Sequence, residues 1–281
     1  SKASGRRKTT GKNGLPTNPW NTSVQYKRRT LEKDKFQPGS GFTATFRFKL
    51  APGVSRTAMR AVVERPALYR VSVNGKPVEA VKGAWWLDVD FGVFEIGPYV
   101  KDGENAITLT VSPMSIYAEL EPIHLTGDFG VAPAARGWLI VPSAPLSTGA
   151  WVSQKLPFYS DRVAYSADYT LAAGGRQFVR LAGWHGTVAE VRVNGKSAGV
   201  IGWQPYELEI TPLVQAGKNR IEVIVTGSLK NLLGPHHGKI NRGLVSPGSF
   251  RSAPQQQPPG SAYDMERYGL MQGFEVLASG R

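Results

Sequence analysis

The stretch "VRVNGKSAGVIGWQPYELEITPLVQAGKNRIEVIV" (Val191–Val225) decides the fold. Its Asn194-Gly195 pair suits a tight hairpin turn, because both residue types accept the positive φ that such turns need. Apolar and other residues alternate before this turn and again in "IEVIV" (Ile221–Val225). Alternation with one apolar face indicates strands of sheets that are packed on one side, as in sandwiches or barrels.

An earlier part of the chain repeats this stretch. "YRVSVNGKPVE" (69–79) matches "AEVRVNGKSAG" (189–199), and "FEIGPYVKDGENAITLTV" (94–111) matches "LEITPLVQAGKNRIEVIV" (208–225). The two copies are offset by 120 residues at Asn74/Asn194 and by 114 at Asn105/Asn219, so the first copy has six extra residues around "KGAWWLDVDFG". Two copies at this spacing predict two similar domains, each with its own core.

Other segments agree with an all-β fold. "FTATFRFKL" (42–50) and "VAYSADYTL" (163–171) alternate in the same way, and we interpret the ambiguous "TAMRAVVE" (57–64) as mostly strand. The 32 Gly and 20 Pro favour short elements joined by turns. We predict two tandem jelly-roll β-sandwiches. The predicted parts are a basic lead-in or arm (1–36), a first sandwich (37–145) and a second sandwich with a long C-terminal loop (146–281).

The net charge of +13 is concentrated in the arm, where residues 1–36 carry ten Lys or Arg and two acids. We interpret the arm as a solvated tail, with polyanion binding as the alternative. No zinc-finger spacing, RNA-recognition motif or helix-turn-helix pattern occurs, so a nucleic-acid partner is not expected. The chain has no Cys and hence no disulfide or thiolate metal site. It has no apolar run of membrane-span length, and its start at Ser1 suggests a processed protein or a fragment.

The repeat resembles the galactose-binding-like, sugar-binding jelly-roll domain of glycoside hydrolase family 2 and of related large α-L-rhamnosidase-type hydrolases. The resemblance covers roughly residues 40–230 and is closest in the second copy, since the first lacks the Thr that follows the Ile of "LEIT". The residues that carry it are Val191, Val193, Asn194, Gly195, Gly199, Pro205, Tyr206, Ile210, Thr211, Leu213, Gly217 and Asn219.

The resemblance implies that the chain itself is non-catalytic. In those hydrolases the carboxylate pair lies in a separate (β/α)₈ barrel, and this chain shows no alternating βα pattern. We therefore expect the accessory, C-terminal part of a larger glycoside hydrolase-like protein, or a free-standing relative. The expected partners are a poly- or oligosaccharide and a catalytic barrel domain. The expected location is secreted, periplasmic or extracellular. No cofactor is required, although many such sandwiches carry a structural calcium.

Carbohydrate binding needs a flat aromatic face together with amide, imidazole or acid groups for the hydroxyls. The second copy offers these in "AGWHG" (182–186), "IGWQPYE" (201–207) and "KNLLGPHHG" (230–238). The carbohydrate-binding candidates are Trp184, His185, Trp203, Gln204, Tyr206, Asn231, His236 and His237. Weaker candidates are Trp85, Trp86, Asp88 and Asp90 of the first copy. The alternative is that these tryptophans fill the core between the sheets.

The segment "NLLGPHHGKINRG" (231–243) departs from ordinary closure of a sandwich, because it continues past the last repeat strand. We expect its two leucines to anchor it and Gly234-Pro235 to bend it, which would present Asn231, His236 and His237 at a pocket or domain interface. By the resemblance, such a loop can complete the substrate site of a neighbouring barrel.

Two rival functions stay open. A small stand-alone polysaccharide-degrading enzyme would need a carboxylate pair, for which Asp88/Asp90 or Glu119/Glu121 are available. Glu207 and Glu209 lie on the outward face of a strand, where solvation is expected. Adjacent histidines on an extended chain point to opposite sides, which disfavours a zinc site, and no metal ligand is assigned. The other rival is a purely structural scaffold.

Overall fold

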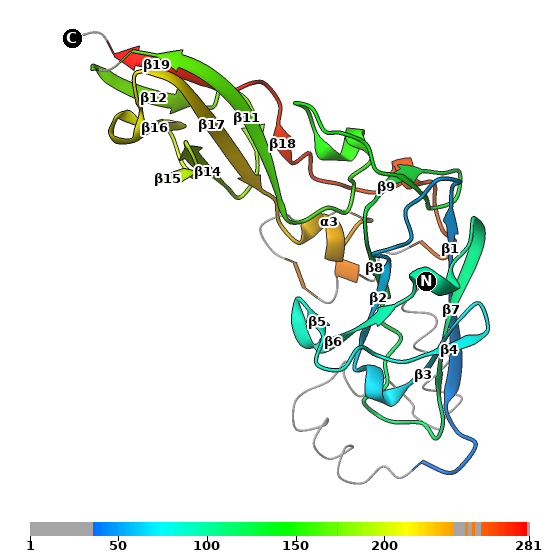
Figure 1. Ribbon diagram of the computed structural model, residues 1–281. Coiled ribbons are helices and arrows are strands. Elements are labelled where there is room, and N and C mark those ends of the chain that lie inside the picture. The colour runs from blue at the N-terminus through cyan, green and yellow to red at the C-terminus, as the bar shows by residue number, and fades with distance from the viewer. Residues whose placement is uncertain (1–35, 173, 239–244, 247–248, 251–253, 280–281) are drawn as a thin grey trace. The chain divides into compact units, whose positions relative to one another are not determined.

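The computed structural model describes residues 36–172, 174–238, 245–246, 249–250 and 254–279 (Figure 1). It divides into two compact units. Unit 1 comprises the described residues within 1–143 and 237–263, and unit 2 those within 144–236 and 264–281. Both are β-sandwiches, and the α-helix of the described part is the single turn α3 (Lys230–Leu233). The basic arm predicted over 1–36 lies, apart from its last residue, outside the described residues.

Unit 1 consists of two sheets whose strands pair antiparallel, except for one parallel contact between β1 and β10. The six-stranded sheet contains, in spatial order, β4 (Lys76–Val78), β3 (Arg70–Val73), β7 (Gly103–Val111), β1 (Phe42–Leu50), β10 (Trp138–Pro142) and β9 (Phe129–Pro133). The four-stranded sheet contains β5 (Trp85–Trp86), β6 (Asp88–Glu95), β2 (Arg60–Glu64) and β8 (His124–Thr126).

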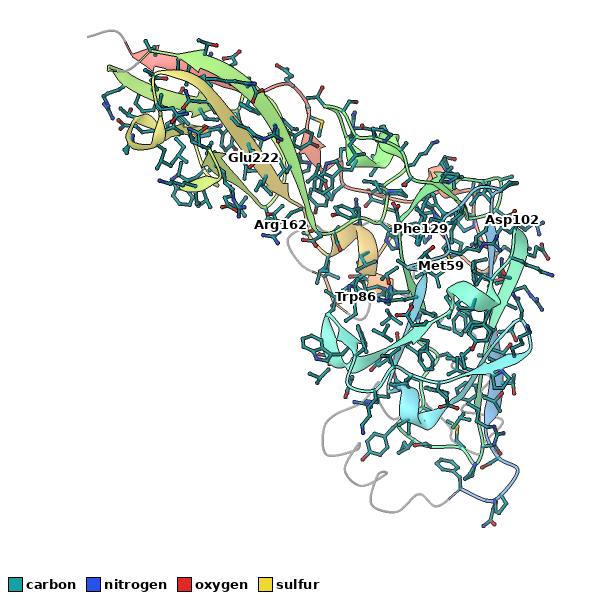
Figure 2. The ribbon with its side chains drawn as sticks, in the orientation of Figure 1. Met59, Trp86, Asp102, Phe129, Arg162 and Glu222 are labelled. Atoms are coloured by element: carbon teal, nitrogen blue, oxygen red, sulfur yellow. The ribbon has the colours of Figure 1, made fainter. Side chains whose placement is uncertain are left out.

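The core of unit 1 lies between these two sheets. Val63 and Phe94 of the four-stranded sheet belong to one buried cluster with Val71 and Ile107 of the six-stranded sheet. Met59, which precedes β2, is fully buried in the same cluster (Figure 2). The alternation in "FTATFRFKL" has the predicted cause, since every second residue of β1 is partly or fully buried and Phe46, Phe48 and Leu50 belong to this core.

Unit 2 repeats the plan, with a much shorter strand β16 (Glu207–Glu209) in the place of β6. Its four-stranded sheet contains β11 (Arg162–Leu171), β17 (Gly217–Thr226), β14 (Val188–Val193) and β15 (Lys196–Ile201). A three-stranded sheet contains β16 (Glu207–Glu209), β12 (Arg176–Arg180) and β19 (Glu275–Ser279), and a two-stranded sheet contains β13 (Trp184–His185) and β18 (Gly269–Leu270). In Figure 1 the long strands β11 and β17 run side by side. Trp151 is buried in the core of the unit, and its indole N–H donates to the Tyr165 hydroxyl at 2.8 Å.

The internal repeat is visible in the backbone and in its hydrogen bonds. Asn74 and Asn194 have φ of 51° and 49° at the first central position of their hairpin turns, as the Asn-Gly signal predicts. In each copy this asparagine donates, over 2.9 Å, to the side-chain oxygen of the buried asparagine that begins the next long strand, Asn105 or Asn219. The same polar pair thus ties hairpin to strand in both units.

Strand pairing fixes how the copies correspond further along. Ala61 of β2 pairs with Phe94 of β6, and Val179 of β12 pairs with Leu208 of β16. β2 therefore corresponds to β12 with an offset of 118 residues, and β6 to β16 with an offset of 114. A backbone hydrogen bond just beyond each pair supports the same offsets. The Ile96 amide donates to the Met59 carbonyl in unit 1, and the Ile210 amide donates to the Gln177 carbonyl in unit 2.

The chain path differs from the predicted division, which placed all of 146–281 in the second sandwich. Residues 237–263 group with unit 1, and unit 2 is then completed by β18 and β19. A parallel bridge joins Gly137 to Pro259, and the Gly260 amide donates to the Ala134 carbonyl at 3.0 Å. This polar, Pro-rich segment carries no alternation, so the sequence pattern gave no sign of the strand that it lies against. Within the described residues, no helix has the length and apolar character needed to cross a membrane.

Candidate functional site

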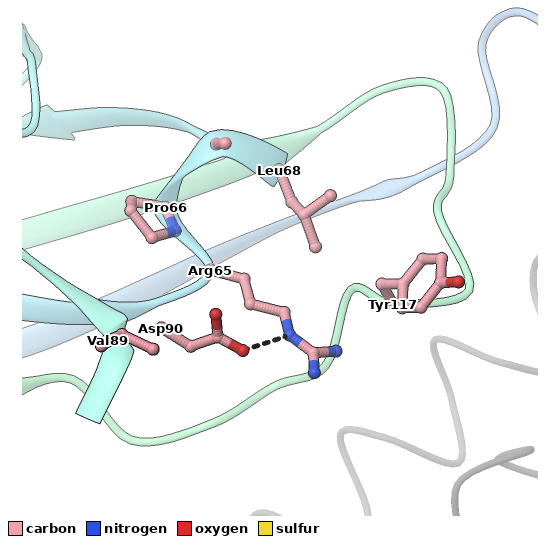
Figure 3. A pocket seen from close by; sticks show the side chains of 7 residues that line it. Arg65, Pro66, Leu68, Val89, Asp90 and Tyr117 are labelled. Atoms are coloured by element: carbon pink, nitrogen blue, oxygen red, sulfur yellow. Dashed lines mark hydrogen bonds and ion pairs between the residues drawn. The ribbon is translucent and has the colours of Figure 1, made fainter.

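A cleft of about 320 Å³ opens in unit 1 beside the 3₁₀ turn Pro66–Leu68, which follows β2 (Figure 3). The cleft combines apolar walls with an ion pair and an aromatic ring. Its lining residues are Arg65, Pro66, Ala67, Leu68, Val89, Asp90 and Tyr117. Its volume is at the lower end of the range typical of small-ligand sites, roughly 300–1,000 Å³.

The local sequence explains why the cleft forms. Arg65 has a left-handed backbone, φ 48°, and Pro66 starts the 3₁₀ turn, so the chain turns sharply at the end of β2. The Arg65 amide donates to the Asp90 carbonyl at 2.7 Å, which holds the turn against β6. Gly92 permits this close approach, because a Cβ there would lie 2.4 Å from the Pro66 ring.

An ion pair forms the polar part of the cleft. Arg65 Nε lies 3.2 Å from Asp90 Oδ2, and the two side chains are 37 % and 54 % exposed. The Arg65 guanidinium carbon lies 5.7 Å from the centre of the Tyr117 ring (Figure 3). At this exposure the pair contributes at most about 1 kcal/mol to stability. Its significance is chemical, because it presents donors and acceptors beside an aromatic face.

The hairpin of β5 and β6 places an exposed tryptophan on the cleft side. Trp85 pairs with Gly92, and paired residues project from the same face of a sheet. Since a side chain at Gly92 would meet Pro66, the 56 % exposed Trp85 shares a face with the 3₁₀ turn. Trp86 projects to the other face, where its ring lies 5.7 Å from that of His124 (Figure 2).

Asp88 and Asp90, the weaker acidic candidates, are close in sequence and differ in role. The Asp90 amide donates to Asp88 Oδ1 at 2.8 Å, so Asp88 stabilises its own turn. Among the described residues that line the cleft, Asp90 is the only acid. Glycoside hydrolysis needs a second carboxylate across the site. The described lining residues supply one carboxylate, beside a guanidinium and an aromatic ring.

Glu209 of β16 is engaged in hydrogen bonds outside the cleft. Glu209 accepts hydrogen bonds from Arg176 at 2.6 Å and from Thr211 at 2.9 Å. These bonds, that of Arg176 first, lower the pKa of Glu209, which keeps the carboxylate ionised at neutral pH and unsuited to act as a general acid. No group of three or more His, Asp or Glu side chains in the described part of the chain comes together to hold a metal ion.

The residues of unit 2 predicted to bind carbohydrate lie in several different surroundings. The Trp184 and Tyr206 rings meet edge to face at 5.5 Å and pack, half-buried, against the core of unit 2. His185 is exposed, and its ring lies 5.3 Å from that of Tyr268. Trp203 is 75 % exposed on the loop between β15 and β16, and the neighbouring Gln204 is exposed as well.

The expectation that Asn231 is presented to a ligand is wrong. Asn231 is 1 % exposed, and its side-chain amide exchanges two hydrogen bonds with the backbone of Glu266, at 2.9 and 2.7 Å. Its own carbonyl lies 2.7 Å from Nε2 of His236, which also packs against Phe158. The polar groups of this loop therefore fasten the returning chain of unit 2, a use that composition alone does not reveal.

The two adjacent histidines belong to different units. His236 lies in unit 2, whereas His237 lies in unit 1, with its ring 4.6 Å from that of Tyr263. Burial lowers the pKa of His237, so its imidazole is neutral at pH 7. Two of the weaker candidates predicted from the sequence lie at the unit 1 cleft: Asp90 lines it, and Trp85 lies beside it. The sequence patterns missed Arg65 and Tyr117, because an isolated Arg-Pro step and a tyrosine in a loop carry no pattern.

Comparisons with known proteins were made on both sequence and structure. Neither a scan against protein-family models nor a search of curated proteins gave a match. Among solved structures, the chain is similar to a rhamnosidase from Novosphingobium sp. PP1Y, with 17 % identity, a TM-score of 0.33, and coverage of 86 % of this chain and 23 % of that chain.

Two further solved structures are similar to the chain. For the Bifidobacterium dentium β-glucuronidase complexed with coumarin-3-O-glucuronide, identity is 21 %, the TM-score is 0.29, and 53 % of this chain and 28 % of that chain are covered. For the Streptomyces avermitilis α-L-rhamnosidase complexed with L-rhamnose, the values are 14 %, 0.29, 87 % and 26 %. The chain spans about a quarter of the length of these three enzymes.

Proposed function

We propose that this chain is a carbohydrate-binding accessory region of a glycoside hydrolase-like protein, and that the unit 1 cleft is a sugar site. The observation that carries the proposal is the Arg65–Asp90 pair beside the Tyr117 ring in a cleft of small-ligand size. Sugar hydroxyls both donate and accept hydrogen bonds, so one hydroxyl can donate to Asp90 while its neighbour accepts from Arg65. The aromatic face receives the apolar side of the ring.

The charge balance of the cleft favours a neutral sugar. Arg65 and Asp90 cancel each other, and the other lining residues, Pro66, Ala67, Leu68, Val89 and Tyr117, are uncharged. An acidic sugar would have to compete with Asp90 for Arg65 and would place two carboxylates close together. The exposed Trp85 extends the site on the same face of the hairpin.

The accessory role is supported by the described lining of the cleft, which contains one acid, Asp90. The chain would deliver or position a glycan for a catalytic barrel domain, the partner that the sequence resemblance implies. Polysaccharides are encountered outside the cell, so an extracellular or periplasmic location is part of the proposal. A stand-alone enzyme would release reducing sugar from the glycans that it binds, and a scaffold would bind none of them.

The test is affinity electrophoresis of the purified chain through neutral xyloglucan, neutral galactomannan and acidic polygalacturonate, with a reducing-sugar assay alongside. We expect retardation by a neutral glycan without product release. Asp90→Asn should weaken this binding about tenfold or more, as loss of a charged hydrogen-bond partner does. The matched control is Glu95→Gln, which removes a 2.8 Å ion pair with Arg60 on the same two strands. Equal binding by Asp90→Asn and wild type would overturn the cleft assignment.

A further inference from the structure

The repeat correspondence carries the unit 1 cleft onto a definite place in unit 2. With the offset of 120 residues, Val81 corresponds to Ile201, and with the offset of 114 residues, Gly92 corresponds to Tyr206. The loop 202–205 therefore stands where unit 1 has residues 82–91. With the offset of 118 residues, Pro66 corresponds to Trp184. The surface at Trp203 is therefore the counterpart, in the second sandwich, of the rim of the cleft in the first.

A contact beneath the two places supports the correspondence. In unit 1 the Pro66 ring packs on Gly92. In unit 2 the corresponding residues, Trp184 and Tyr206, are also in contact, with ring centres 5.5 Å apart. Both copies therefore have a contact between these two positions. In unit 1 it is made by a proline ring on a glycine, and in unit 2 by two aromatic rings.

The exposed side chains next to this contact also differ between the two copies. Val89 of the segment 82–91 and Trp203 of the loop 202–205 are both highly exposed, at 76 % and 75 %. Arg65 has no cationic counterpart, because the corresponding residue is Gly183, and the loop 202–205 carries no acid to match Asp90. The loop of unit 2 therefore presents an indole and an amide, both exposed, and no charged side chain of its own.

We propose that Trp203 and Gln204 form a second glycan site, an open platform, and that the chain binds polymeric glycans through both units. This inference rests on the proposed function of the unit 1 cleft. An exposed indole stacks on the apolar face of a pyranose, and the Gln204 amide donates to and accepts from its hydroxyls. An open surface suits a run of sugars in an extended chain, whereas the cleft suits one or two units.

Two sites of different form predict a dependence on glycan length. A short oligosaccharide occupies one site at a time and binds more tightly in the enclosed cleft than on the open platform, so its affinity reports mainly the cleft. A polymer that engages both sites gains effective concentration at the second, which raises the observed affinity by orders of magnitude. Loss of the platform should therefore weaken polymer binding and leave oligosaccharide binding unchanged.

The experiment compares the neutral polysaccharide of the panel that retards the chain most with a short oligosaccharide cut from it. Affinity electrophoresis measures binding of the first, and isothermal titration calorimetry binding of the second. Trp203→Ala should weaken polysaccharide binding at least tenfold and change oligosaccharide binding less than twofold. Trp203→Phe, which keeps an aromatic face, should recover most of the loss. The matched control is Leu233→Ala, which removes another exposed apolar side chain of unit 2.

The outcomes separate the two proposals. Unchanged polysaccharide binding by Trp203→Ala, together with weakened binding by Asp90→Asn, overturns the platform and leaves the cleft in place. Equal losses for polymer and oligosaccharide also overturn it, because the platform would then belong to a single site. Absence of retardation of the wild-type chain by every glycan overturns the proposed function itself. Because Trp203 is exposed, its replacement should not unfold the chain, so weaker binding by the variant would reflect a lost contact. A thermal melt of each variant checks that it is folded.

Discussion

Asn219 is fully buried, and both the nitrogen and the oxygen of its side-chain amide form hydrogen bonds. Its Nδ2 group donates to the carbonyls of Gln215 and Gly217 at 2.8 and 3.0 Å, and its Oδ1 accepts from Asn194 and from the Gln215 amide. Truncation would leave several of these groups buried without partners, each at a cost of about 1–3 kcal/mol. We expect Asn219→Ala to lower the free energy of unfolding of unit 2 by about 2–4 kcal/mol, as measured by urea titration.

The repeat supplies the comparison for this variant. Asn105→Ala removes the same set of bonds in unit 1, to Lys101, Gly103 and Asn74, and should lower the stability of unit 1 by a similar amount. The exposed neighbour Lys218 is the control, because its alanine variant loses only a surface ion pair with Asp168. An Asn219→Ala variant as stable as Lys218→Ala would show that the shared polar pair does not stabilise the hairpin.

Tyr69 links the stability of unit 1 to alkaline pH. Its hydroxyl donates to the Glu119 carbonyl at 2.9 Å and accepts from the Glu119 amide at 3.1 Å. Burial, the largest cause, raises the pKa of Tyr69 from 10.0 to about 12. The neutral form is therefore favoured by folding. Its contribution is complete below pH 10, the unfolded value, and is lost as the pH rises toward about 12.

The measurement is the difference in unfolding free energy between wild type and Tyr69→Phe, followed from pH 8 to pH 12. At neutral pH the variant should be less stable by about 1 kcal/mol, because the Glu119 backbone loses a hydrogen-bond partner. This difference should shrink above pH 10, since only the wild type has the hydroxyl whose ionisation opposes folding. A difference that is constant over the whole range would contradict the raised pKa.

At the level of elements, two glycines allow residues 254–263 to lie against the β9–β10 hairpin of unit 1. The Gly137 amide donates to the Pro258 carbonyl at 2.7 Å. A Cβ at Gly260 would lie 2.5 Å from the Gly137 carbonyl oxygen, which is backbone and cannot move aside. We expect Gly260→Ala to destabilise unit 1 by about 1–3 kcal/mol and to speed hydrogen exchange at the Gly137 amide. Gly202→Ala is the control, because nothing lies within 4 Å of its Cβ position.

The elements also show where sequence patterns succeed. Strands β1 and β11 match the alternating segments almost to the residue, because one face of each packs on a core and the other meets water. The Asn-Gly turns are equally local, since the positive φ is a property of the turn itself. The hydrogen bonds between Asn231 and Glu266 are not local, because they join positions 35 residues apart in the chain. No spacing in the sequence predicts them.

The same distinction holds for the candidate site. Asp90 and Trp85 were named because they lie in one short aromatic and acidic segment. Arg65 and Tyr117 approach them only after β2 pairs with β6 and the following loops fold over. The tryptophans of unit 2 divide between core and surface according to which face of a strand or loop they occupy, so that Trp184 packs inward while Trp203 is exposed. The sequence therefore predicted the kinds of residue at the site, but which of them lie close together could be seen only in the folded structure.

For the whole molecule, the last strand decides whether unit 2 can fold. β19 pairs with β12 over five residues, and Tyr268, Leu270 and Phe274 are part of the unit 2 core. We expect a chain that stops at residue 263 to lose the unfolding transition of unit 2 and to keep that of unit 1, as followed by calorimetry. Glu275→Gln in the full chain is the control, because it removes only an exposed ion pair with Arg180. Two retained transitions would contradict the expectation.

The path of the chain has a consequence for how the molecule is made and how it can change. A ribosome completes ordinary tandem domains one after another, so the first can fold before the second is translated. Here unit 1 is not complete until residues 237–263 have been translated, after nearly all of unit 2, and unit 2 is not complete until β19 has been translated. A recombination event that exchanged residues 144–236 alone would carry away an unfinished sandwich. Although they repeat one sequence pattern, the two units are therefore interleaved along the chain, and neither can be cut out as one continuous segment.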